Sequence, residues 1–274
     1  MPELPEVEQV KNSLREYIKN KTITKVIINV ERLIKYPSPS EFVEQITGRA
    51  FLDLERFGKY LVFTLDNGQL LVIHLRMTGA LIYKHNSQED VNKPRVIFEL
   101  NDGVMYYCDT RTLGTIHLIN PEEKSMLKGL DTLGVEPISP DFTVEYLQER
   151  FVAKKRLVKA ALLDQSIIAG LGNIYVDEAL AKSKIHPKRL TNSLSEQELA
   201  MLHANIKEII KAAIANRGTT FRDYKDADGN KGSNQDHLFV YGRGGQACKL
   251  CGTVLVYEKI AGRGTVYCPQ CQQP

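Results

Sequence analysis

The sequence lacks the features of an exported or membrane-spanning protein. None of its apolar runs reaches the roughly 20 residues that a transmembrane helix needs. The first six residues, MPELPE, carry acids and prolines where a secretory signal would carry basic residues and then an apolar stretch. The 274 residues also contain no internal repeat and no low-complexity tract. We therefore expect a globular protein of the cytoplasm.

Cysteine is scarce, with five in the chain, but four of the five are regularly spaced. Cys248 and Cys251 form one C-x-x-C pair, Cys268 and Cys271 form another, and sixteen residues separate the pairs. Disulfides are unexpected in a cytoplasmic chain of this length, whereas this is the spacing of a zinc ribbon. Four thiolates complete a tetrahedral Zn²⁺ and leave no open position, so we expect one structural zinc rather than four unligated thiols. Cys108 lies in an apolar segment and reads as a small buried side chain.

The net charge of +3 is small, yet it conceals a difference between the two halves. Residues 1–149 hold 17 Lys and Arg against 22 Asp and Glu, while residues 150–274 hold 19 against 11. The basic half is the better candidate for a nucleic-acid surface, although such a difference also arises by chance.

The first half of the chain has the pattern of one helix followed by strands. Apolar residues recur at helical spacing from residue 7 to residue 18, with acids in the first turn. From residue 23 to about 119 the sequence is β-rich, and Asn67-Gly68 and Asp102-Gly103 each separate two strand-like segments, which is typical of hairpins. We expect an antiparallel β-sandwich or barrel packed against the first helix.

Beyond Pro140 the pattern becomes helical, so the fold class is α+β with more than one domain. Expected helices lie near residues 144–152, 157–164, 174–183 and 195–216, and the last opens with the capping box Ser195-Glu196-Gln197-Glu198. The polar, glycine-containing stretch 223–235 is expected to be a mobile loop. The domain boundaries expected are 2–133, 134–222, 223–237 for the loop, and 238–274.

Two further sequence features are compatible with phosphate binding, but neither is specific for it. Lys154, Lys155, Arg156 and Lys159 surround the start of one expected helix, and the turn 170–173, with sequence GLGN, leads into another. Glycines beside a helix N-terminus allow a close approach to phosphate, but an ordinary interhelical turn has the same sequence. What a zinc ribbon binds is equally open, because ribbons serve DNA, RNA and protein.

A set of motifs that runs through the whole chain resembles one family. The opening PELPEVE at residues 2–8 is, letter for letter, that of the formamidopyrimidine-DNA glycosylases. Further matches in family order are RFGK at 56–59, HLRMTG at 74–79, D-x-R at 109–111, DQ at 164–165, GNIY at 172–175, VYGR at 240–243 and GRGT at 262–265. The resemblance implies an N-terminal β-sandwich, a helix–two-turn–helix domain and a zinc ribbon. It also implies a bacterial DNA-repair enzyme that excises oxidised purines and then cleaves the strand, acting as a monomer on double-stranded damaged DNA and associated with the nucleoid when bound.

The resemblance also implies the catalytic residues, and simple chemistry explains them. Once Met1 is removed, Pro2 offers a secondary α-amine with a reference pKa near 8, about two units below that of lysine, so more of it is neutral and nucleophilic. Glu3, next in the chain, is expected to act as general acid and base. Lys59 resembles the family lysine that protonates or steers the leaving base, and Arg263 the arginine that grips phosphate. Glu6 can be read simply as an acid at a helix N-terminus.

A base inside a duplex is out of reach, so such an enzyme must rotate the nucleotide out and fill the space. Met77 and Arg111 match two of the family's three void-filling residues; the third is usually phenylalanine and here is Leu113. The remaining expected DNA contacts are His74, Lys93, Lys154 and Asn173. Lys93 lies in a segment, KPR at 93–95, where relatives often carry histidines, and is expected to contact phosphate through its charge.

Two alternatives remain. An endonuclease VIII-type enzyme would use the same nucleophile and fold on oxidised pyrimidines, although the Leu4-Pro5 that follows Pro2-Glu3 favours the purine enzyme. A zinc-ribbon DNA-binding protein without catalysis fits the charge distribution but leaves the N-terminal motif unexplained.

Overall fold

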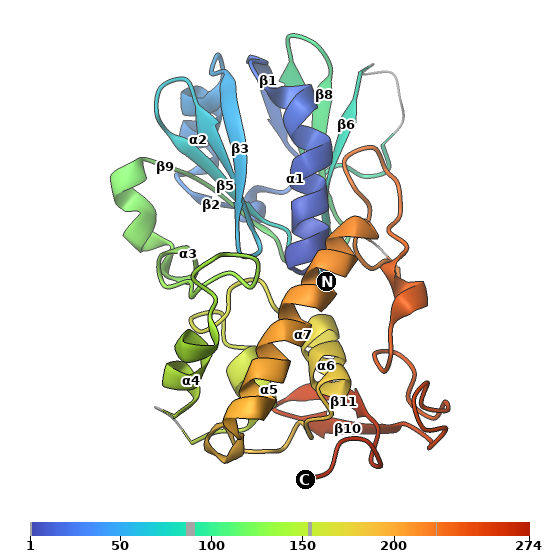
Figure 1. Cartoon of the computed structure of the whole chain (residues 1–274). Coiled ribbons are helices and arrows are strands. Elements are labelled where there is room, and N and C mark those ends of the chain that lie inside the picture. Colours follow the sequence, from blue (N-terminus) through green and yellow to red (C-terminus); the bar gives the residue numbers. More distant parts are fainter. Residues whose placement is uncertain (1, 86–90, 153–154, 223) are drawn as a thin grey trace. The chain divides into compact units, whose positions relative to one another are not determined.

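The computed structural model describes residues 2–85, 91–152, 155–222 and 224–274 (Figure 1). The chain forms two compact units. Unit 1 consists of Met1–Asp131 and Asn216–Gln235, and unit 2 of Thr132–Ala215 and Asp236–Pro274. Unit 1 is therefore discontinuous in sequence, because a segment that follows the longest helix returns to it.

Unit 1 is built on two β-sheets, which confirms the predicted sandwich. The four-stranded sheet has the order β1 (Ile23–Ile28), β7 (Val96–Leu100), β8 (Val104–Asp109), β6 (Gly79–Lys84). The five-stranded sheet has the order β2 (Ile34–Tyr36), β9 (Thr115–Ile119), β5 (Leu70–His74), β4 (Tyr60–Leu65), β3 (Phe51–Phe57). All neighbours are antiparallel except β2 and β9, which run parallel. The sandwich is thus antiparallel, as predicted, with a short parallel edge strand added to one sheet.

Both hairpins predicted from dipeptides are present. Asn67-Gly68 joins β4 to β5, and Asp102-Gly103 joins β7 to β8. Gly68 and Gly103 have φ of 84° and 92°, a left-handed conformation that glycine adopts without steric cost.

The core of unit 1 lies between the sheets and helix α1 (Leu4–Ile18). The predicted apolar stripe of α1 is buried except at Tyr17, which is partly buried, and Tyr224 and Ala227 from the returning segment join the same core. Helix α2 (Pro39–Ile46) buries Phe42 and Ile46. A second apolar cluster on the five-stranded sheet is packed against Leu127 and Leu130. Leu127 lies between the 3-10 helix η2 (Pro121–Met126) and helix α3 (Lys128–Asp131), and Leu130 lies in α3.

Unit 2 contains the predicted helices and the cysteine-bearing ribbon. Its elements are α4 (Val144–Val152), α5 (Val158–Leu162), α6 (Asn173–Lys182), α7 (Glu196–Ala215) and the hairpin β10 (Val256–Ile260) and β11 (Arg263–Tyr267). The capping box of α7 is formed, since Ser195 N–H donates to Glu198 Oε2 at 2.8 Å and Glu198 N–H to Ser195 Oγ at 3.2 Å. None of the helices in the described ranges is long and apolar enough to cross a bilayer.

The returning segment of unit 1 includes most of the predicted mobile loop. Asp226 is buried and accepts hydrogen bonds from Arg217 and from the amides of Asp228 and Asn230. Ala227 N–H donates to Ser13 Oγ at 3.1 Å, and its carbonyl accepts from Tyr83 N–H at 2.9 Å. Residues 226–230 therefore form a turn bonded to α1 and to the edge strand β6; the loop's mobility stays a prediction.

Candidate active site and nucleic-acid interface

The predicted nucleophile and acid lie at the start of α1. Pro2 and Glu3 are buried, and Glu6, one turn into the helix, is 1 % exposed. Glu6 accepts the amide hydrogens of Glu3 at 2.8 Å and of Thr219 at 2.7 Å. Its carboxylate thus joins the first turn of α1 to the returning segment, which supports the structural reading of Glu6.

Arg56 connects α1 to the turn that carries Lys59. Its Nε donates to Glu8 Oε2 at 2.7 Å, and its Nη1 donates to the carbonyl of Gly58 at 2.9 Å. Gly58 has φ of 56°, and Lys59 beside it is 8 % exposed. The RFGK motif therefore encodes a β3–β4 turn tied to the helix that bears Pro2 and Glu3.

The predicted void-filling residues are brought together by the sheet topology. The β5–β6 connection leads from the five-stranded to the four-stranded sheet, and the β8–β9 connection leads back. Because His74 pairs with Thr115 and Gly79 pairs with Asp109, the two connections run beside one another. They carry Met77 and Leu113, 37 % and 47 % exposed, and the exposed Arg111; we call these three side chains the wedge.

His74 lies at the same end of the sandwich, on β5 opposite Tyr60. Its Nδ1 accepts the Arg76 N–H at 3.0 Å, which places the proton of the neutral ring on Nε2. Burial, followed by the nearby charges of Arg76 and Lys59, lowers the pKa of His74 from its usual 6.5 to about 3. His74 is thus arranged as a neutral N–H donor at any ordinary pH.

A buried neutral histidine makes stability depend on pH. The unfolded chain binds a proton at His74 below pH 6.5 and the folded chain only near pH 3, so the stabilisation is complete above pH 6.5 and is lost as the pH falls. We expect His74→Gln to reduce the loss of unfolding free energy between pH 7 and pH 5 by about 2 kcal/mol, measured by urea denaturation. The exposed His237→Gln is the control. Equal losses in all three proteins, or ring protonation near pH 6.5 by NMR, would contradict this assignment.

Lys93 and its neighbours have different roles. Lys93 is exposed and has φ of 51°. Arg95 contacts the chain itself: its Nε donates to the carbonyl of Asp109 at 3.0 Å and its N–H to the carbonyl of Tyr107 at 2.7 Å. Within KPR, the first cation faces solvent and the second stabilises the end of β8.

In unit 2, the glycine turn before α6 is held by Gln165. The Gln165 side chain accepts the Gly170 N–H at 2.9 Å and donates to the carbonyl of Leu171 at 2.8 Å. Asn173 then begins α6 and donates from Nδ2 to the carbonyl of Gly264 at 2.7 Å. Among the buried side-chain nitrogens and oxygens in the described ranges, its Oδ1 alone has no hydrogen-bond partner.

Asn173 lines an open groove of about 480 Å³ in unit 2. The other lining residues are Asp177, Tyr241, Gly242, Gly244, Tyr257, Gly264 and Val266. An unpartnered polar atom beside such a groove is suited to a polar ligand. Arg263 is exposed and precedes Gly264 at the start of β11, after the turn formed by Ala261 and Gly262.

Two of the four basic residues noted around the start of α5 form ion pairs within the chain. Lys159 is fully buried, forms an ion pair with Asp177 and donates to Thr265 Oγ1 at 2.7 Å. Arg156 pairs with Asp164 at 2.8 Å. Lys159 therefore joins α5, α6 and β11 instead of lying on the surface. Lys154 lies outside the described residues.

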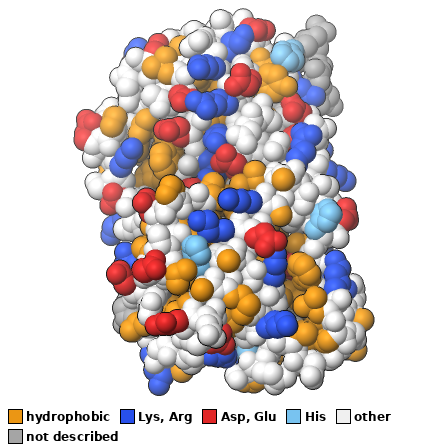
Figure 2. All heavy atoms as spheres, viewed as in Figure 1, with side chains coloured by type: hydrophobic (Ala, Val, Ile, Leu, Met, Phe, Trp, Pro, Cys, Tyr) orange, Lys and Arg blue, Asp and Glu red, His pale blue; other side chains and the backbone are white. Residues whose placement is uncertain are grey.

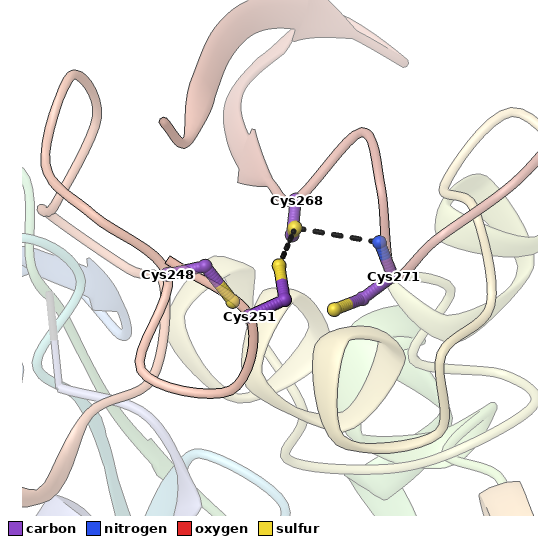
Figure 3. A group of neighbouring side chains, drawn as sticks. All are labelled: Cys248, Cys251, Cys268 and Cys271. Carbon is purple, nitrogen blue, oxygen red and sulfur yellow. Dashed lines mark hydrogen bonds between the residues drawn. The ribbon is translucent and has the colours of Figure 1, made fainter. Parts of the chain in front are cut away.

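The four predicted cysteine ligands converge in unit 2 (Figure 3). Their Sγ atoms lie within 4.8 Å of one another, and Zn–S bonds of about 2.3 Å would place tetrahedral sulfurs about 3.8 Å apart, which a small inward movement of the thiolates provides. Amide hydrogens of Leu250 and Cys271 point to the Sγ atoms of Cys248 and Cys268, each at 3.4 Å, as expected around thiolates. The donor set fits a closed, structural metal site.

On one face of the molecule, charge is less segregated than along the sequence. The face drawn in Figure 2 has basic and acidic side chains interspersed. The excess of acids in residues 1–149 and of bases in residues 150–274 is therefore not visible there as two separate fields.

Comparison with known proteins matches the chain from end to end. Residues 1–116 match the formamidopyrimidine-DNA glycosylase N-terminal domain, residues 133–225 its H2TH domain, and residues 245–274 the zinc finger found in FPG and IleRS. The formamidopyrimidine-DNA glycosylase of Desulfitobacterium hafniense is 42% identical over 272 residues, covering 99% of this chain and 100% of the relative. The chain belongs to the formamidopyrimidine-DNA glycosylase family. It is a DNA glycosylase of that family, with the expected α+β fold.

Solved structures of the family agree with this assignment. A Lactococcus lactis FPG mutant in complex with a Fapy-dG containing DNA has a TM-score of 0.93 and 36% identity, with 100% of both chains covered. MutM in complex with carbocyclic 8-oxo-G containing DNA has a TM-score of 0.92 and 34% identity, again over 100% of both chains.

Three residues with evident roles in unit 1 were not assigned one from the sequence. Arg56 and Asp109 stand within family motifs, but nothing in a motif says whether a residue touches substrate or holds a loop. Thr219 contributes a backbone amide, for which side-chain identity gives no signal.

Proposed function

We propose that this glycosylase repairs oxidised purines, namely 8-oxoguanine and formamidopyrimidines, in double-stranded DNA. It removes the base through a Schiff base on Pro2 and then cleaves the strand by β,δ-elimination. It acts as a monomer in the bacterial cytoplasm, on the nucleoid, with one structural Zn²⁺ held by the four cysteines. The observation that carries the proposal is the Pro2-Glu3 pair at the buried start of α1, held there by Glu6.

Pro2 supplies the nucleophile in the protein from which Met1 has been removed. Its nitrogen forms a bond to C1′ of the deoxyribose as the bond from C1′ to the base breaks and the base leaves with the electron pair. Opening of the sugar ring then gives an iminium. Because the proline nitrogen already has two carbon substituents, the iminium is permanently cationic and withdraws electrons from C2′. Loss of a C2′ proton then expels the 3′ phosphate.

Three further side chains complete the chemistry. Glu3 donates a proton to the sugar ring oxygen as the ring opens and accepts protons later. Lys59, on a turn that Arg56 ties to α1, protonates or steers the departing base. Arg263, exposed at the start of β11, binds the phosphate lost in the second elimination.

The wedge fills the space left when the nucleotide rotates out. Its members are exposed, and two are apolar, as filling a gap in a base stack requires. The backbone contacts of the flanking DNA are assigned to His74, Lys93, Lys154 and Asn173. Of these, His74 is a neutral donor, whereas Lys93 and Lys154 supply the salt-dependent part of the affinity.

The experiment that tests this function is single-turnover cleavage of a panel of duplexes, each with one lesion. We expect 8-oxoguanine opposite cytosine and formamidopyrimidine duplexes to be cleaved with both phosphates lost. Preferential cleavage at oxidised pyrimidines would instead indicate the endonuclease VIII-type activity. Binding without cleavage of any lesion would indicate a non-catalytic DNA-binding protein.

Leu113 departs from the phenylalanine usual at this position, and its replacement gives a specific prediction. Leucine is apolar and fills space, but it lacks a ring that could stack on a base for about 1–3 kcal/mol. We expect Leu113→Phe to raise the affinity for lesion duplexes by about fivefold or more. Single-turnover cleavage of a preformed abasic site should change little, because the base is already absent.

Leu52→Phe is the matched control for this substitution. Leu52, on β3, is 45 % exposed against 47 % for Leu113, so the two changes add similar apolar surface. Unchanged duplex affinity together with strongly altered abasic-site cleavage in Leu113→Phe would show that residue 113 is not part of the wedge.

A further inference from the structure

Asp109 joins the two connections that carry the wedge. It ends β8 and is 1 % exposed. Its Oδ1 accepts the Thr78 hydroxyl from the β5–β6 connection and the Arg111 N–H, at 3.2 Å, from the β8–β9 connection. Its Oδ2 accepts the Gly114 N–H at 2.8 Å and faces the Tyr107 hydroxyl at 3.4 Å. One buried carboxylate therefore binds groups from both connections.

Thr78 adds a second hydrogen bond between the two connections. Besides donating to Asp109, its Oγ1 accepts the Arg111 N–H at 3.1 Å. The backbone amide of a wedge residue on one connection is thus held by a side chain that follows Met77 on the other.

Tyr107 fixes the spacing between the same connections. A Cβ on Gly114 would stand 1.7 Å from the Tyr107 hydroxyl oxygen, and one on Gly79 would stand 2.7 Å from it. The Tyr107 side chain, which is fully buried on β8, therefore occupies the space that side chains at Gly79 and Gly114 would need. The connections cannot approach each other more closely, and the carboxylate prevents them from separating.

The wedge side chains need such support because packing does not provide it. Met77 and Leu113 are more than a third exposed, so the core does not set their positions. We propose that Asp109, together with Thr78, is the positioning device that holds Met77, Arg111 and Leu113 as one unit for insertion into the base stack. This inference rests on the proposed function, since it assumes that these side chains fill the space left by an extrahelical nucleotide.

Asparagine at position 109 should break the arrangement although it has the same shape. Both carboxylate oxygens accept a backbone N–H, from Arg111 and from Gly114. If the amide NH₂ is turned toward Gly114, a buried N–H is left without an acceptor. If it is turned toward Arg111, residue 109 can no longer accept the Thr78 hydroxyl, and the Arg111 N–H keeps only Thr78 Oγ1 as acceptor. Thr78→Val removes the hydroxyl with little change of shape, whereas Thr78→Ser keeps it.

The test compares two substrates that differ in whether a void must be filled. One is a duplex with a single 8-oxoguanine opposite cytosine; the other is a single strand with one abasic site, which has no stacked partner to separate. We expect Asp109→Asn and Thr78→Val to slow single-turnover cleavage of the duplex by about tenfold or more, and that of the single strand by less than about twofold. Thr78→Ser should restore the duplex rate. Asp102→Asn, the same change at the exposed hairpin that precedes β8, should match the wild type on both substrates.

A second readout reports the wedge directly. A 2-aminopurine placed in the strand opposite an uncleavable tetrahydrofuran site becomes more fluorescent when the stack opens, so its emission should rise with wild type and Thr78→Ser and much less with Thr78→Val. Equal emission with all variants would overturn the proposal. Equal slowing on both cleavage substrates, with an unchanged melting temperature, would also overturn it.

The outcomes separate this proposal from the proposed function. A wild-type protein that cleaves neither substrate would contradict the proposed function, and the emission at the tetrahydrofuran site would still decide whether Asp109 and Thr78 hold the wedge. If Asp109→Asn does not fold, Thr78→Val and Thr78→Ser carry the comparison alone.

Discussion

Borohydride should link the processed protein covalently to a duplex containing one 8-oxoguanine opposite cytosine, and peptide mapping should find the DNA on Pro2. Protein that retains Met1 should form no adduct, because an amide nitrogen at residue 2 is not nucleophilic. Its rate of lesion cleavage should fall at least about a thousandfold, the scale on which removal of a covalent nucleophile acts. Intact mass determines which form is present.

The control for this prediction uses the same protein twice. Material that retains Met1 is treated with methionine aminopeptidase, and we expect both cleavage and the adduct to return as the mass falls by one methionine. The Pro2 assignment would be wrong if Met1-retaining protein cleaved at the normal rate with an adduct on a lysine. Lys59 would then be the first residue to examine, because it is held on a turn tied to α1.

Zinc removal should weaken DNA binding before it affects unit 1. Metal analysis should find one zinc per chain, and chelation or Cys268→Ser should lower the affinity for an abasic-site duplex by at least about tenfold. The reason is local: Cys268 and Cys271 follow β11, which carries Arg263 and the Gly264 carbonyl that Asn173 contacts. Without the metal, two short segments with little core of their own lose their shared anchor.

Cys108→Ser is the matched control, since Cys108 is on β8 and outside the cluster. It should keep the zinc content and the DNA affinity. The melting of unit 1, followed through its tyrosines, should be similar in all three proteins. Active protein without zinc, or a loss of unit 1 stability equal to the loss of DNA binding, would contradict the prediction.

The sequence was sufficient wherever a structural signal is local. Asn67-Gly68 and Asp102-Gly103 predicted two hairpins because left-handed backbone at the glycine is intrinsic to the dipeptide. The capping box at Ser195 predicted the start of α7, and cysteine spacing predicted the four-sulfur cluster. The family motifs supplied residues such as Met77 and Leu113 but gave no account of how they are held.

Interactions between distant segments were not readable in this way. Lys159 stands in the sequence among other basic residues, and only the fold shows that it is buried, paired with Asp177 and hydrogen-bonded to Thr265. The parallel pairing of β2 with β9 has no local signature either. Asp109 was visible as part of a motif, yet its role depends on Thr78, 31 residues earlier, which no helical or strand periodicity connects to it.

The bond from the Thr219 amide to Glu6 can form only late in synthesis, because the two residues are far apart in the sequence. Strands and helix from the first 131 residues emerge early, but the core they build lacks Tyr224 and Ala227, and the carboxylate of Glu6 lacks the amide that completes its pairing. Bacterial translation adds about 5–20 residues per second, so several seconds separate the two parts. During that interval strands β1–β9 are already present, but the amino end still lacks the bond between Glu6 and the Thr219 amide. The residues nearest the start of the gene therefore reach their working arrangement only after the ribosome has read most of it.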